Sequence, residues 1–215
     1  MIKGVWIAVS GLALVLFLAL HLGGVAVALV DPAAFERYAD SLHRQAWLPW
    51  IEVVLAAAVL GHPLLSLRRV LANRQARGPV AGPLRSRRQG PWEPLAALAA
   101  RAIPWSGAVL ALFLILHLAQ LRWDRPPAGA ELAAVRAALA SPWSLALYVA
   151  AGAALGMHLL HGGESAARRL GLLAPATAPS LRLAGRGLAL LLGAGFTLIP
   201  VALVLRPAVM AGAGG

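Results

Sequence analysis

The chain contains no cysteine, and only 13% of its 215 residues are charged. The absence of cysteine excludes disulfides, thiolate metal sites and iron–sulfur clusters bound by this chain. The scarcity of charge, with 60% hydrophobic residues and a mean hydropathy of +0.76, argues against a soluble domain. A chain this apolar belongs in a lipid bilayer.

Five apolar stretches are long enough to cross a bilayer. They cover about residues 4–30, 47–67, 96–122, 142–163 and 183–206. Each has roughly 20 residues or more, which spans a hydrocarbon core of about 30 Å. Lipid cannot satisfy exposed backbone groups, so each stretch is expected to be a helix. The sequence therefore predicts an all-α membrane protein with five transmembrane helices in a single membrane domain, residues 1–215.

The segments between the spans differ in character. Residues 31–46 and 124–141 carry apolar residues at helical spacing, which predicts short helices lying at the membrane interface. Residues 75–95, rich in Gly, Pro and Arg, are expected to form an irregular loop, and the tail 211–215 to be disordered.

The distribution of arginine predicts an orientation. Connections between spans 2 and 3 and between spans 4 and 5 hold the larger arginine clusters: Arg68, Arg69, Arg74, Arg77, Arg85, Arg87, Arg88, Arg101, Arg168, Arg169, Arg182 and Arg186. The other two connections mix arginine with carboxylates. The positive-inside rule then places the N-terminus in the cytoplasm and the C-terminus outside a bacterial inner membrane. Most of the net charge of +11 is explained by topology, without a nucleic-acid partner.

One motif occurs twice. The stretch from Ser106 to Leu118 matches the stretch from Ser10 to Leu22 at nine of thirteen positions, with an offset of 96 residues. The shared Ser, Gly, Phe and His carry more weight than the shared leucines. The same offset carries His62 onto His158, so a helical hairpin of about residues 5–70 is predicted to recur at 96–168.

Each of the first four spans has one histidine deep inside it. Counting about 1.5 Å per residue from the span ends, His21 and His117 lie in the outer half, and His62 and His158 in the inner half. Depth alone then pairs His21 with His117 and His62 with His158. Two layers of paired histidines predict a four-helix bundle that holds two bis-histidine haems, with the four histidines as the axial iron ligands.

Other readings of the four histidines stay open. Buried polar side chains can simply hold membrane helices together, and histidines can form a proton relay. A zinc or di-metal site is disfavoured because the spans are nearly free of carboxylates. The pairing in two matched layers favours haem.

Further residues are candidates for weaker reasons. Glu52 is the one carboxylate well inside a span, and it either exchanges protons with a quinone or extends to the interface. Ser10 and Ser106 share a helical face with their histidines and are expected at a haem edge or propionate. His161 and Arg101 either bind a propionate or mark the inner interface.

These features resemble one known family. They are Ser10-Gly11, Phe17 and His21; Glu52 and His62; Arg101, Ser106-Gly107, Phe113 and His117; and His158, His161, Ser165 and Ile199-Pro200. The pattern is similar to the cytochrome b membrane anchors of succinate dehydrogenases and fumarate reductases, in the single-chain type with five helices and two haems.

The resemblance implies a function for the whole chain. His21 and His117 would bind the distal haem b, and His62 and His158 the proximal haem b. A flavoprotein and an iron–sulfur subunit would dock on the cytoplasmic face, and electrons would pass between the iron–sulfur subunit and a quinone, expected to be menaquinone, in either direction. The chain itself would perform no succinate chemistry.

One position departs from the family. Gly156 stands where some fumarate reductases of this type carry a glutamate linked to proton movement across the membrane, so that pathway is in doubt here. Two alternatives also remain: the cytochrome b subunit of a hydrogenase or formate dehydrogenase, or a membrane scaffold or transporter without haem.

Overall fold

The computed structural model describes residues 2–77, 90–123 and 125–206. Within them the chain forms seven α-helices and one short π-helix, and no strand. The elements are α1 (Ile2–Val30), α2 (Pro32–His43), α3 (Leu48–Arg77), α4 (Glu93–Leu118), η1 (Ala119–Trp123), α5 (Glu131–Leu139), α6 (Pro142–Arg169) and α7 (Ala178–Leu205). Five of these helices, with α4 continued by η1, are long and apolar enough to cross a membrane, as the sequence predicts.

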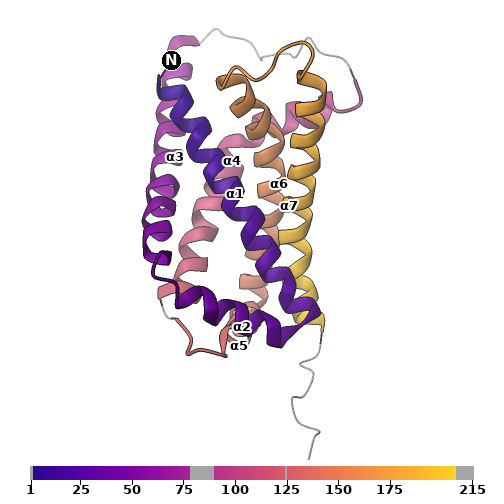
Figure 1. Ribbon diagram of the computed structural model, residues 1–215. Helices are drawn as coiled ribbons and strands as arrows, with labels where there is room; N and C mark the ends of the chain where they lie inside the picture. The colour runs from indigo at the N-terminus through magenta and orange to yellow at the C-terminus, as the bar shows by residue number, and fades with distance from the viewer. Residues whose placement is uncertain (1, 78–89, 124, 207–215) are drawn as a thin grey trace, which may run out of the picture.

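The five long helices form one bundle, with α2 and α5 lying across one end (Figure 1). We call this end the α2–α5 end. The closest packing is of α6 on α7, followed by α4 on α6 and α1 on α3. The two hairpins suggested by the repeat are therefore both packed pairs. Helix α1 also contacts α6 and α7, which joins the first hairpin to the rest of the bundle.

Large apolar side chains cover the outside of the bundle, as expected of helices that face lipid. Four tryptophans are exposed at the α2–α5 end, the arrangement typical of a membrane interface: Trp47, Trp50, Trp123 and Trp143. The two predicted interfacial helices are also present as α2 and α5. Asp31 caps α2 by accepting a hydrogen bond from the amide of Ala34 at 2.9 Å.

Several helices extend beyond the spans predicted from the sequence. Helix α3 runs about ten residues past the predicted end, because Arg68, Arg69 and Arg74 continue the helix beyond the apolar stretch. Helix α4 begins within the segment predicted as an irregular loop. Residues 78–89 of that segment and the tail 211–215 lie outside the described residues.

Glycines allow α6 and α7 to approach closely. A Cβ atom at Gly193 would lie 2.7 Å from Cα of Gly156, and one at Gly152 would lie 2.6 Å from the backbone nitrogen of Thr197. Small residues are the usual means of close helix packing in membranes. Gly156 therefore lies against α7, and a Cβ atom at this position would be 3.4 Å from Cα of Gly193.

Candidate functional site

The structure brings the four span histidines together in two pairs. The ring centroids of His21 and His117 are 6.0 Å apart, and those of His62 and His158 are 6.3 Å apart. The first pair lies nearer the α2–α5 end, and each pair joins one helix of the first hairpin to one of the second. The pairs are those that the depth argument predicts.

Serine side chains hold the rings of the His62–His158 pair. Oγ of Ser10 lies 3.2 Å from Nδ1 of His62, and Oγ of Ser106 lies 3.1 Å from Nδ1 of His158. Each serine hydroxyl also donates to a carbonyl of its own helix, at Trp6 and Ile103 respectively. The direction of each serine–histidine contact depends on the histidine tautomer; with the serine hydroxyl donated to its own helix, Nδ1 of the histidine is the donor.

The glycines of the repeated Ser-Gly motif lie against the same rings. A Cβ atom at Gly11 would be 3.0 Å from Cε1 of His62, and one at Gly107 would be 3.7 Å from Cε1 of His158. The carbonyl oxygen of Ile7 adds a second acceptor, 3.2 Å from Nδ1 of His62. In each hairpin, the serine of the repeated motif on the first helix therefore contacts the histidine of the second helix. The two residues are 52 positions apart in both hairpins.

Aromatic rings surround the His21–His117 pair. Phe17 stacks on His21 and Phe113 on His117, one turn earlier in each helix, and Phe196 of α7 also stacks on His21. Nδ1 of His117 lies 3.1 Å from the hydroxyl of Tyr148. In the part of the chain that the structure describes, the ring nitrogens of His21 make no hydrogen bond.

This arrangement suits a metal bound between each pair. The four histidines are the residues that would hold such a group, one pair at each site. Metal-binding histidines usually donate their other ring N–H to a nearby oxygen, which fixes the tautomer. In the Nδ1–H tautomer, His62, His158 and His117 would each do so, and Nε2 would be unprotonated. Histidine, aspartate and glutamate form no group of three or more around a potential metal site among the described residues, so the donor set is two pairs.

No known protein family, curated protein or solved structure matches this chain. The geometry of the site and the sequence resemblance therefore carry the functional assignment.

Glu52 lies in an ion pair. Its carboxylate receives two hydrogen bonds from Arg122 of η1, at 3.0 Å from Nε and 2.8 Å from Nη2. This bidentate contact links α3 to the end of α4. The predicted role of Glu52 in quinone protonation stays a prediction, but its partner in the structure is this arginine.

The two remaining candidates lie apart from the histidine contacts. Arg101 is exposed on α4, and His161 is partly buried on α6, one turn past His158. Within the described ranges neither makes a hydrogen bond or an ion pair, and their expected contact with a propionate stays a prediction.

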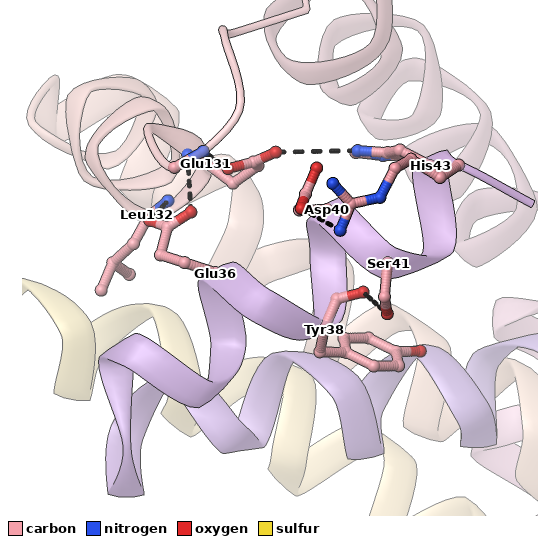
Figure 2. A network of polar contacts seen from close by, with 9 residues as sticks. Glu36, Tyr38, Asp40, Ser41, His43, Glu131 and Leu132 are labelled. Carbon is pink, nitrogen blue, oxygen red and sulfur yellow. Dashed lines mark hydrogen bonds and ion pairs between the residues drawn. The ribbon is translucent and has the colours of Figure 1, made fainter.

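A second polar cluster joins α2 to α5 (Figure 2). The carboxyl of Glu36 accepts hydrogen bonds from the amides of Leu132 at 2.9 Å and Glu131 at 3.2 Å, and so caps α5 from another helix. Nδ1 of His43 lies 3.6 Å from the carboxylate of Glu131. The packing of α2 against α5 partly buries His43, and the sequence alone does not show this packing.

The two carboxyls of this cluster have opposite pKa shifts. Burial and a hydrogen bond with Glu131 raise the pKa of Glu36. Burial alone would raise the pKa of Glu131, but the hydrogen bond with Glu36, backbone amides and the charge of His43 outweigh it and lower that pKa. Burial, together with the positive charge of Arg125, lowers the pKa of His43. The protonated form is therefore favoured at Glu36 and the ionised form at Glu131.

A cavity of about 390 Å³ opens at the same end of the bundle. It is lined by Gln120, Arg125, Pro126, Pro127, Ala134, Ala137 and Ala138. Gln120 also reaches into the bundle, where it contacts Tyr148 and Ser144. Gln120 therefore connects the cavity to Tyr148, the residue whose hydroxyl contacts His117.

Sequence reasoning missed three of these contacts. Tyr148, Gln120 and Phe196 all belong to the surroundings of the His21–His117 pair, and none was predicted. For Tyr148 the repeat offered one indication. Tyr148 follows Glu52 by 96 residues, so the two residues occupy the same position in their hairpins. Phe196 carried no signal, because the fifth span has no histidine and no counterpart in the repeat.

Proposed function

We propose that this chain is a dihaem cytochrome b that anchors a succinate:quinone oxidoreductase in the membrane. His21 with His117 and His62 with His158 would each hold one haem b, which supplies one-electron transfer between an iron–sulfur subunit and quinone. The chain supplies the ligands, their orientation and an apolar surrounding that excludes water.

The observation that carries the proposal is the arrangement of the two pairs. The ring centroids are 6.0 and 6.3 Å apart, and Nδ1 of three rings lies within hydrogen-bond distance of an oxygen, which leaves Nε2 of those three rings available to a ligand. Histidines that only join helices also hydrogen-bond to side chains of neighbouring helices, as these do to Ser10, Ser106 and Tyr148, so the argument for a ligand depends on the ring spacing within each pair. A ring spacing that leaves room for one metal favours haem instead.

Quinone, expected to be menaquinone, is proposed to bind at the α2–α5 end. The cavity there offers the side chains of Gln120 and Arg125 as hydrogen-bond donors to a carbonyl, with alanine and proline walls. The flavoprotein and iron–sulfur subunits are proposed to dock at the opposite end, where the arginines of α6 and α7 gather.

Succinate chemistry is the part of the proposal that depends on the sequence resemblance. A cytochrome b of a hydrogenase or formate dehydrogenase could use the same histidine pairs. The subunits that purify with the chain separate the two: a flavoprotein and an iron–sulfur protein support the succinate assignment, whereas a nickel or molybdenum subunit would replace it.

The experiment is a reduced-minus-oxidised spectrum of the gently purified complex, with pyridine haemochrome quantification. About two haems b per chain are expected. Absence of haem from the intact complex would overturn the proposal and return the four histidines to a structural or proton-relay role.

A further inference from the structure

Tyr148 is a buried residue with two polar partners on a single helix turn. Its side chain is on α6, and the residue is 8% exposed. The hydroxyl lies 3.1 Å from Nδ1 of His117 and 3.1 Å from Oε1 of Gln120. Its ring also packs edge-on against Phe113 at 4.8 Å. The ring is fixed on three sides by α4 and η1.

The hydrogen bonds of this group run in one direction. The hydroxyl of Tyr148 donates to Oε1 of Gln120, so its oxygen is free to accept from Nδ1–H of His117. The amide nitrogen of Gln120 donates in turn to Oγ of Ser144 at 3.1 Å, which fixes the side-chain amide orientation. Gln120 belongs to the π-helical turn η1, a type of turn that is often found at functional sites.

We propose that Tyr148 and Gln120 are positioning residues for His117. They hold its ring in the Nδ1–H tautomer and fix its plane, so that Nε2 points to the bound group. This inference rests on the proposed haem site, but it makes a separate statement: one histidine of the four has a tyrosine–glutamine support that its counterpart lacks.

The repeat shows where the asymmetry arises. At the His62–His158 pair, the two hairpins provide equivalent serines, Ser10 and Ser106. At the other pair they differ. The position of Tyr148 is occupied by Glu52 in the first hairpin, and Glu52 pairs with Arg122 instead of supporting His21. His117 is thus the ligand of this pair that the chain can tune through a hydrogen bond.

A hydrogen bond from Nδ1–H makes an imidazole a stronger electron donor to its metal. Stronger donation favours ferric iron over ferrous iron and lowers the reduction potential. Loss of the Tyr148 hydroxyl should therefore raise the potential of the haem held by His117. The haem held by His62 and His158, which has its own serine acceptors, should be unaffected.

The experiment compares Tyr148→Phe with the unmodified complex by potentiometric titration and by low-spin ferric EPR, after haem content has been counted. Tyr148→Phe removes only the hydroxyl and keeps the ring contact with Phe113. The matched control is Tyr38→Phe, the other tyrosine of the chain, which lies on α2. We expect an upward shift of one potential and a changed EPR signal for one haem in Tyr148→Phe, and neither in Tyr38→Phe.

Gln120→Leu tests whether the residues act as a unit. Alone, it should shift the same potential in the same direction by a smaller amount, because the hydroxyl loses its acceptor but stays in place. Added to Tyr148→Phe, it should produce no further shift. If the potential shift of the double variant equals the sum of the two single shifts, Gln120 does not act on His117 through Tyr148, and the inference is contradicted.

The outcomes separate this inference from the proposed function. Two haems in the unmodified complex with unchanged potentials and EPR in Tyr148→Phe would overturn the inference alone. Selective loss of one haem in Tyr148→Phe, the one also lost in His117→Ala, would support it. Absence of haem from the unmodified complex would overturn both.

Discussion

Oγ of Ser106 on α4 lies 3.1 Å from Nδ1 of His158 on α6. The same hydroxyl lies 3.2 Å from the carbonyl oxygen of Ile103, so in the Nδ1–H tautomer the histidine donates to the serine while the serine donates to its own helix. The contact thus orients a buried ring from a neighbouring helix. Its recurrence between Ser10 and His62 shows that both hairpins orient a histidine by the same device.

Ser106→Ala should loosen the hold on the group bound at the His62–His158 pair. The substitution leaves the helix intact but removes the acceptor for Nδ1–H of His158. Loss of such an outer contact typically weakens metal binding by about 10- to 100-fold. Haem loss to an excess of apo-globin, followed by absorbance, should be faster for one of the two haems. Ser180→Ala, at an exposed position of α7, is the control; equal haem loss from both variants would contradict the prediction.

Gly152→Ala should destabilise the bundle by separating α6 from α7. The new Cβ would lie 2.6 Å from the backbone nitrogen of Thr197, and backbone cannot move as easily as a side chain. Overpacking of this kind costs about 1–3 kcal/mol. Gly163→Ala, on the same helix with open space around the new Cβ, is the matched control. Thermal unfolding in detergent should show a lower midpoint for Gly152→Ala than for Gly163→Ala.

The ion pair between Glu52 and Arg122 should contribute little to stability. Their side chains are 37% and 46% exposed, and exposed pairs usually contribute about 0.2–1 kcal/mol. A double-mutant cycle with Glu52→Gln and Arg122→Gln should give a coupling energy in that range. Quinone reduction in the same variants tests the catalytic hypothesis. If only Glu52→Gln lowers the rate, the carboxylate serves proton transfer; equal losses would assign it a structural role.

The α2–α5 contact should be most stable over an intermediate acidic range. The raised pKa of Glu36 means that its contribution is present at low pH and is lost as the pH rises through its folded-state pKa. The lowered pKa of Glu131 means that its contribution is present above its unfolded-state pKa and is lost as the pH falls through the folded-state value. The lowered pKa of His43 adds a loss of stability as the pH falls below the ordinary histidine value.

Amide hydrogen exchange at Glu131 and Leu132 measures this contact, because both amides donate to Glu36. We expect their protection, after correction for the intrinsic pH dependence of exchange, to decrease above the folded-state pKa of Glu36. In Glu36→Gln this decrease should disappear, because the side chain no longer ionises. Asp40→Asn, which removes another carboxylate of α2, should leave the decrease in place.

Much of the fold follows from the sequence because each helix carries its own signal. Apolar length predicts the five spans, and the offset of 96 residues predicts the paired hairpins. The pairing of His21 with His117 follows from depth alone, since position along a membrane helix fixes height. The helix ends were less predictable: α3 extends through arginines that hydropathy excludes from a span but that are good helix formers.

The contacts around the histidines were harder to predict because they depend on rotation and tilt. The sequence places Ser106 on the face of His117, whereas in the structure its hydroxyl meets His158 of the next helix. Tyr148 reaches His117 through the packing of α6 on α4, which hydropathy does not specify. Phe196 reaches His21 because glycines bring α7 close to the bundle, so its role depends on three helices at once.

The pairing of the histidines is the central claim, and haem counts in His→Ala variants test it most directly. His21→Ala, His117→Ala and their combination should each lose the same single haem, whereas His62→Ala and His158→Ala should lose the other. Combining His21→Ala with His62→Ala should remove both. Retention of two haems in every single variant, or equal loss of both haems from each of them, would contradict two separate bis-histidine sites.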